Sequence, residues 1–121
     1  GWNAAIEGGQ ATLFDFDECG IGPQAYDVAT FLWGCTQVLP DQRLPLWPRF
    51  VAGYTAVRRL PAADLAALDL FIIVRELWFL GASAEGVAHW GDNWFKTSGI
   101  APRIERVRER CENLATPRLL A

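Results

Sequence analysis

The stretch "TLFDFDECGIGPQAYDVATFLW", residues 12–33, decides the fold because its character changes twice along its length. It opens as an apolar strand, becomes acidic at Asp15, Asp17 and Glu18, and then passes through Gly-Ile-Gly-Pro into a helical pattern. Carboxylates that leave an apolar strand repel one another and are costly to remove from water. We therefore expect a cation, or a cleft open to solvent, at this end of the strand.

A short hairpin precedes and includes the start of this stretch. Residues 3–7 (NAAIE) predict one strand and residues 11–16 (ATLFDF) predict its return, because the Gly-Gly-Gln at 8–10 supplies the positive φ of a tight turn. Antiparallel strands bring Asn3, at the entry, beside Asp15, at the exit. Amide and carboxylate oxygens suit a hard cation such as Mg²⁺, which completes its shell with water and substrate phosphates.

The rest of the chain shows apolar residues at helical spacing, and Pro23 and Pro61 stand where a helix can begin. The expected helices cover about 25–38, 45–58, 61–84 and 101–115. The third is apolar almost all round, which predicts the central buried helix, and Gly86 and Gly91 are expected to interrupt the chain after it. The predicted fold class is mainly α with a short β-hairpin.

We expect one domain over residues 1–121, with a metal-site hairpin and loop at 1–24 and a helical part at 25–121. Net charge is −3, and the basic cluster at 103–110 alternates with glutamates, so it predicts a solvated, salt-bridged helix face and no nucleic-acid partner. The longest apolar segment, 68–82, is too short and too charged to span a membrane.

Arg75 and Glu76 interrupt that apolar segment, and each should pair with something because an unpaired buried charge is costly. Cys19, Cys35 and Cys111 fit no zinc spacing, so we expect reduced thiols in a cytoplasmic protein. The chain begins at Gly1, contains no Met and shows no signal peptide, which suggests a fragment of a longer protein.

The segment "GIGPQAYDVATFLW", 20–33, resembles the Gly-Pro-x-x-Tyr-Asp-Leu-Ala segment of the aminoglycoside phosphotransferase and choline kinase family. Gly1-Trp2-Asn3 match the last three places of that family's catalytic loop, His-Gly-Asp-x-His-x-x-Asn. The segment "FIIVRELWFLGASAEGVAHWGDNWF", 71–95, is similar to the helical tail of its bacterial branch, which includes stress-response kinase and homoserine-kinase-like members. The resemblance covers nearly the whole chain.

This resemblance implies the carboxy-terminal part of a kinase-like fold that transfers the γ-phosphoryl group of ATP to a hydroxyl of a small molecule, or of Ser or Thr. Asn3 and Asp15 would be the Mg²⁺ ligands, Asp17 would support them, and Asp27 would hold the catalytic loop. The catalytic Asp and the nucleotide-binding lobe would precede Gly1, so this chain alone is expected to be inactive.

Three other interpretations stay open. The acidic loop could simply be solvated, the chain could be a non-catalytic helical interaction module on a kinase-like scaffold, or it could be an independent all-α domain whose hairpin only mimics the motif. In the last case the side-chain oxygens of Asn3 and Asp15 should point apart. His89 is more readily explained as a packed or surface residue than as a catalytic one.

Two further expectations concern surfaces. Aromatic residues of the later helical region could floor a substrate pocket, although core packing explains them more simply; these are Trp78, Phe79, Trp90, Trp94 and Phe95. Removal of an amino-terminal lobe would expose apolar surface near the hairpin, so self-association of this fragment is expected.

Overall fold

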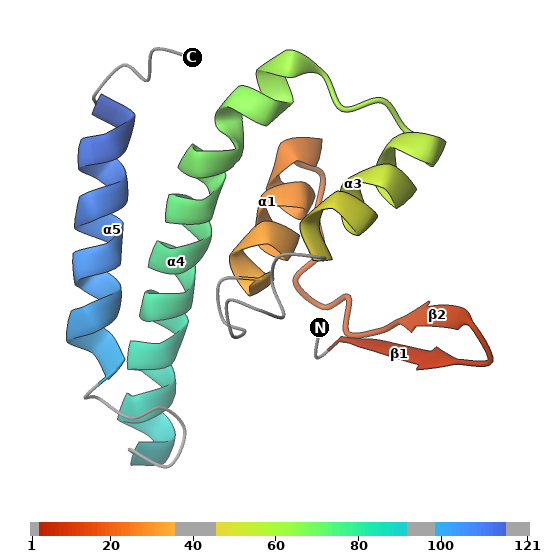
Figure 1. The fold of residues 1–121 in the computed structure, drawn as a ribbon. Helices are drawn as coiled ribbons and strands as arrows, with labels where there is room; N and C mark the ends of the chain where they lie inside the picture. The colour runs from red at the N-terminus through yellow and green to blue at the C-terminus, as the bar shows by residue number, and fades with distance from the viewer. Residues whose placement is uncertain (1–2, 36–45, 92–98, 116–121) are drawn as a thin grey trace.

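The protein is mainly α-helical, with a two-stranded antiparallel sheet near its amino terminus (Figure 1). The computed structural model describes residues 3–35, 46–91 and 99–115. Its elements are β1 (Ala4–Glu7), β2 (Gln10–Leu13), α1 (Gln24–Cys35), α3 (Leu46–Val57), α4 (Ala62–Trp90) and α5 (Ile100–Ala115). The predicted class, mainly α with a short hairpin, is confirmed.

The hairpin turn forms where the two glycines predict it. Gly8 and Gly9 have φ values of 55° and 79°, a left-handed conformation that glycine adopts without steric cost. The return strand is shorter than the predicted 11–16, since β2 ends at Leu13. Asp15 has φ 66°, which is incompatible with an extended strand, so the chain turns away from the hairpin there.

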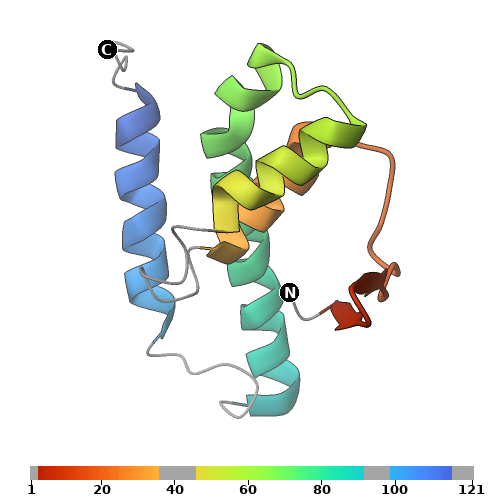
Figure 2. The same cartoon turned by 45° about the vertical axis from the view of Figure 1, so that its right-hand side comes forward.

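The apolar strand that leads to the acidic residues is exposed, not buried. The hairpin stands apart from the helices (Figure 2), and Ile6 and Leu13 are 79% and 63% exposed. The register pairs Leu13 with Ala4 and Ile6 with Ala11, so one face of the sheet consists of these four apolar residues. An amphipathic two-stranded sheet therefore presents its apolar face to solvent.

The core lies where α1 packs against α4. Ala25, Val28 and Ala29 of α1 meet Leu68 and Ile72 of α4, and the two alanines let the helices approach closely. Half-buried side chains surround this centre: Leu32, Trp33, Trp47, Phe50, Tyr54, Leu60 and Phe71. The helical body thus carries most of the burial in the described chain.

Aromatic contacts attach α3 to α1. The rings of Phe31 and Phe50 stack with centroids 3.8 Å apart, and Trp47 and Tyr54 lie near Phe50 on the same helix. Offset or stacked aromatic pairs add about 0.5–1.5 kcal/mol beyond the area that they bury. The helix α3 is therefore attached to α1 through aromatic side chains, and none of its residues is fully buried.

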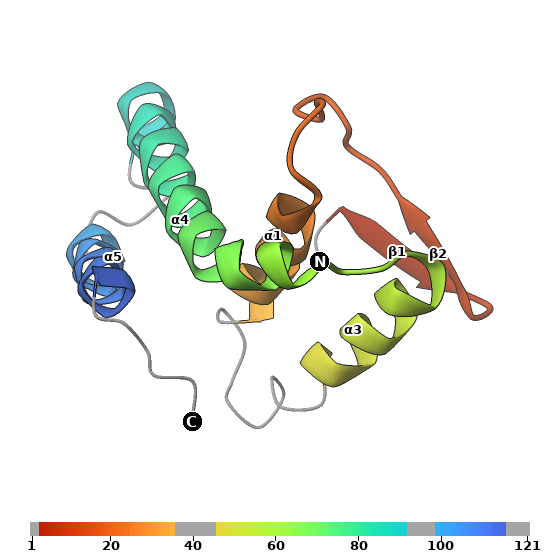
Figure 3. The ribbon, with the colours of Figure 1, turned by 90° about the horizontal axis from the view of Figure 1, so that it is seen from above.

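The helix α4 is central but buried on one side only. It lies between α1 and α5 (Figure 3), while Leu70 and Leu77 on its outer side are 51% and 53% exposed. It also runs past its predicted end, because Gly86 is helical and buried while Gly91, with φ 69°, ends the helix. Packing outweighs the propensity cost of one glycine, about 1 kcal/mol. None of the described helices combines the length and hydropathy needed to cross a bilayer.

Candidate functional site

Asn3 and Asp15 meet at the open end of the hairpin. The Asn3 side chain donates from Nδ2 to Oδ2 of Asp15 over 2.8 Å, and the backbone N–H of Phe14 donates to the Asn3 carbonyl over 3.1 Å. Both side chains are exposed. The two residues that the antiparallel register predicts to be neighbours therefore are neighbours, and the Asn3 atom that contacts Asp15 is the amide nitrogen.

The backbone at Asp15 is strained. Among the described residues it is the one non-glycine position with positive φ, at 66°. For most residues with a side chain this conformation costs on the order of 1–2 kcal/mol, although Asp tolerates it better than most, and such positions collect at functional sites. An exposed carboxylate in this conformation has no packing reason to be there.

The donor set at this position suits a hard cation. The hydrogen bond to Asp15 uses the amide N–H of Asn3, so the Asn3 amide oxygen and the second Asp15 oxygen stay available as acceptors. In the described parts of the chain, no group of three or more His, Cys, Asp or Glu side chains could enclose a metal. Two oxygen ligands fit Mg²⁺, which is commonly held by one or two carboxylates together with substrate phosphates.

Asp17 and Asp27 stand further from the pair. Asp17 is exposed in the loop after β2, next to a turn in which the Cys19 N–H donates to the Phe16 carbonyl over 3.0 Å. Asp27 is exposed in the first turn of α1, where a carboxylate interacts favourably with the helix dipole. No described residue hydrogen-bonds to the Asp27 side chain, so its role in holding a catalytic loop stays a prediction.

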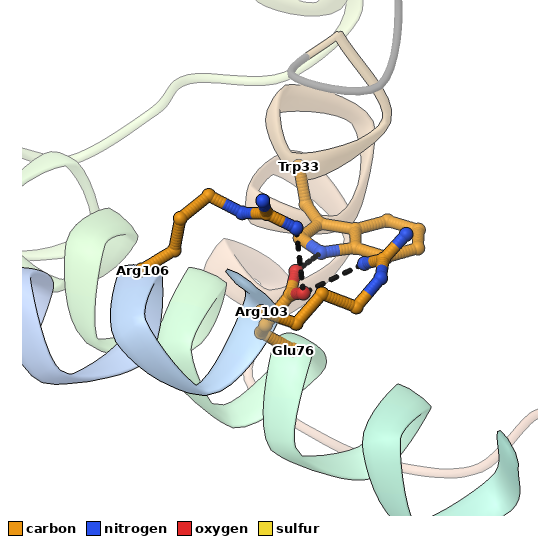
Figure 4. Close-up of polar contacts among 4 residues, drawn as sticks. All are labelled: Trp33, Glu76, Arg103 and Arg106. Carbon is orange, nitrogen blue, oxygen red and sulfur yellow. Dashed lines mark hydrogen bonds and ion pairs between the residues drawn. The ribbon is translucent and has the colours of Figure 1, made fainter. Parts of the chain in front are cut away.

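A second polar cluster lies inside the helical body (Figure 4). Glu76 of α4 is 4% exposed, and its carboxylate accepts hydrogen bonds from Trp33 Nε1 of α1 and, over 2.6 Å, from Arg103 Nη1 of α5. Arg106 Nη2 lies 3.7 Å from Oε1 of Glu76. We call these four residues the Glu76 junction, because they join three helices through one carboxylate.

The junction limits the expectation that the basic cluster at 103–110 forms a solvated, salt-bridged helix face. Arg108 and Glu105 form the exposed pair that the alternating charges predicted, 3.0 Å apart. Arg103, however, has a side chain only 14% exposed, and Arg110 reaches Asp69 of α4 over 3.3 Å. The basic residues thus attach α5 to α4. Sequence reasoning predicted that Glu76 is paired but not with which residues.

Arg75 is paired with aromatic rings. Its guanidinium carbon lies 4.3 Å from the ring centroid of Trp78 and 5.5 Å from that of Trp33, within the range of cation–π attraction. Its Nε is buried without a hydrogen-bond partner. Trp78 therefore packs against a charged side chain. Of the other predicted pocket residues, Phe79 lies 4.5 Å from the Arg103 guanidinium carbon, Trp90 is exposed, and Trp94 and Phe95 lie outside the described residues.

The remaining reactive side chains are unremarkable in their surroundings. His89 is exposed and its Nδ1 lies 2.9 Å from the Glu85 carbonyl, one turn earlier in α4, as expected of a surface histidine. Cys19 and Cys111 are exposed, Cys35 is buried, and none of the three forms a disulfide within the described residues.

Comparison with known proteins gives one informative relative. An uncharacterized protein of Deinococcus radiodurans is 45% identical over 83 residues, which are 65% of this chain and 24% of that protein. The chain therefore spans about a quarter of the length of this relative. No family model matches the chain, and no solved structure gives a significant match.

Proposed function

We propose that this chain is the carboxy-terminal, metal-binding part of an ATP-dependent phosphotransferase with a kinase-like fold, similar to the aminoglycoside phosphotransferase family. The enzyme would move the γ-phosphoryl group of Mg·ATP to a hydroxyl of a small molecule, or of Ser or Thr. The observation that carries the proposal is the contact of Asn3 with Asp15, 2.8 Å between Nδ2 and Oδ2, at the open end of the hairpin.

The proposed division of labour follows from the chemistry of phosphoryl transfer. That reaction depends mainly on positioning and on neutralising charge on the phosphate oxygens. The Asp15 carboxylate and the Asn3 amide oxygen would hold Mg²⁺, which supplies this neutralisation when bound. The Gly-Gly turn fixes the two strands that carry them, and Asp17 adds negative potential nearby. The catalytic Asp and the nucleotide-binding lobe would lie outside residues 1–121, so the chain alone is expected to be inactive.

Three further observations support the proposal. A helix, α1, follows the acidic loop and is buried against the body, in the order that the resemblance implies. The Deinococcus relative is about four times as long as the segment that it shares with this chain, which leaves room for a further lobe. The third is the set of three cysteines at no zinc spacing, the pattern from which we propose a cytoplasmic location.

The test is turnover in a longer protein that carries this segment together with a nucleotide-binding lobe. Asn3→Ala and Asp15→Ala should each lower Mg·ATP-dependent phosphoryl transfer by at least about 100-fold, as expected when an electrostatic contact to the transition state is lost. The matched control is Glu7→Gln, since Glu7 is an exposed acid at the turn end of the same hairpin. Unchanged turnover in the Asp15 variant would refute the proposal.

A second candidate is a non-catalytic helical interaction module that keeps the kinase-like scaffold. The exposed apolar faces of the hairpin and of α4 favour it, because faces of this kind usually meet another surface. The two candidates differ in one measurable property of the longer protein. A phosphotransferase should show a thermal shift with nucleotide that depends on Mg²⁺, whereas an interaction module should show none.

A further inference from the structure

The helix α4 carries a second apolar face, on the side away from its buried residues. Six exposed residues recur at spacings of four, three, four, three and four, and we call them the α4 stripe: Leu70, Val74, Leu77, Gly81, Ala84 and Ala88. At 100° per residue they lie nearly opposite Leu68 and Ile72, which pack against α1, and Glu76, which contacts α1 and α5. The helix α4 itself lies between α1 and α5 (Figure 3). This spacing is typical of a seam that packs against another helix.

The outer side of α4 is almost free of charge. Among its exposed residues only Glu85 and His89 have ionisable side chains, and both lie near the carboxy-terminal end. A surface helix of a globular protein normally shows charged residues on its solvent face. The occupant of this face should therefore be apolar.

Side-chain size changes along the stripe in a way that identifies the occupant. The amino-terminal half carries Leu70, Val74 and Leu77, whereas the carboxy-terminal half carries only Gly and Ala. When a second copy of α4 is laid antiparallel about a two-fold axis near Phe79, each large residue meets a small one. The layers are then Leu70 with Ala88, Val74 with Ala84, and Leu77 with Gly81.

We propose that this face binds a second copy of the chain, with the two α4 helices antiparallel and in this register. Such a pairing is isologous, so each layer occurs twice about the axis. The parallel alternative would place Leu on Leu in one half and Gly or Ala on Gly or Ala in the other. That arrangement leaves the second half without side chains to interlock, so the size pattern favours the antiparallel pair.

Gly81 lies near the centre of the stripe, beside the two-fold axis. Apart from the nearby backbone of its own helix, a Cβ at this position would meet no atom of the chain within 4 Å. The space over Gly81 is therefore open to an approaching side chain, and in the proposed dimer Leu77 of the second copy occupies it. A larger residue at 81 should obstruct the dimer, and circular dichroism checks its effect on the single chain.

The length of the stripe sets the strength of the contact. Nineteen residues of helix span about 27 Å at a rise of about 1.5 Å per residue, which makes a small interface. We therefore expect a dimer with a dissociation constant on the order of 10–100 μM. The association does not depend on the proposed phosphotransferase function, and the two can fail separately.

The test is sedimentation velocity of the chain and its variants from about 5 to 500 μM, a range that brackets the expected constant. A reducing agent is required because Cys19 and Cys111 are exposed. The wild-type chain should shift from monomer to dimer with concentration. Gly81→Leu should weaken the dimer at least tenfold, and Leu77→Ala should weaken it about threefold to tenfold through the lost layer. Circular dichroism checks that each variant keeps its helix content.

The decisive variant combines both changes. In Leu77→Ala/Gly81→Leu the layer becomes Ala against Leu, so the dimer should recover to within about threefold of wild type. Ile6→Ser on the exposed hairpin is the control and should leave association unchanged. A wild-type chain that stays monomeric, a double variant as weak as Gly81→Leu, or loss of the dimer in Ile6→Ser alone would each overturn the proposal. Should Gly81→Leu lose helix content, Leu77→Ala alone decides: a dimer as strong as that of the wild type would overturn the proposal.

Discussion

The hairpin end and the helical body each contain one carboxylate that contacts other elements or residues, and the two carboxylates differ in burial and in the donors around them. Glu76 is buried and receives Trp33, Arg103 and Arg106, so its acceptor capacity is used within the chain. Asp15 is exposed, contacts Asn3, and holds a strained backbone. A buried carboxylate with three donors is a structural connection, whereas an exposed and strained one has capacity left for a ligand.

The largest expected effect on stability comes from removing the buried carboxylate of this comparison. Glu76→Ala leaves the mostly buried Arg103 and the Trp33 N–H without their acceptor, which should lower the free energy of unfolding by about 3–5 kcal/mol. Urea unfolding followed by circular dichroism measures this loss. Glu105→Ala is the matched control, because its exposed pair with Arg108 should contribute less than about 0.5 kcal/mol. Equal losses in the two variants would show that the junction does not stabilise the helical body.

A second comparison uses one substitution in both regions. Ile72→Ala removes a side chain that is 2% exposed in the α1–α4 core and should cost about 2–4 kcal/mol. Ile6→Ala removes the same atoms from the exposed hairpin face and should cost less than about 0.5 kcal/mol. The same urea experiment measures both. A large loss of unfolding free energy for Ile6→Ala would mean that the apolar hairpin face is covered in solution, in contrast to its exposure in the structure.

The smallest expected effect concerns the strain at Asp15. Asp15→Gly removes the cost of positive φ, whereas Asp15→Ala keeps it, so the glycine variant should be more stable at the hairpin end by about 1 kcal/mol. Both variants lose the carboxylate, which makes them a matched pair. Amide exchange of the Phe14 N–H, which donates to the Asn3 carbonyl, measures local opening. Equal exchange rates in both variants would mean that φ at this position carries no strain.

The structure of the hairpin end could be predicted from the sequence because the residues that determine it are close together in the chain. Two glycines specify the turn, and the turn fixes the antiparallel register, so the contact of Asn3 with Asp15 follows from positions twelve residues apart. The residues at which the helices end were harder to predict. Gly86 stays helical because α4 is packed against its neighbours, and a propensity argument does not include that packing.

The Glu76 junction shows what local patterns miss. Its arginines lie 27 and 30 residues further along the chain, on a helix whose alternating charges are also typical of a solvated surface. Burial of a charge in α4 predicted that a partner exists, but only the packing of α5 on α4 selects Arg103. Apolar surface near the hairpin was expected, but the exposed face of α4 was missed, because an apolar sequence alone does not determine which helix faces pack against a neighbour.

The most direct measurement of the central claim is a titration of the isotope-labelled chain with Mn²⁺, a paramagnetic substitute for Mg²⁺, followed by nuclear magnetic resonance. The account predicts selective broadening of amides around Asn3 and Asp15, competition by Mg²⁺, no effect at the Glu76 junction, loss of the effect in Asp15→Asn and its retention in Glu7→Gln. Equal broadening in Asp15→Asn and wild type, or broadening spread over the exposed acids of the whole chain, would contradict it.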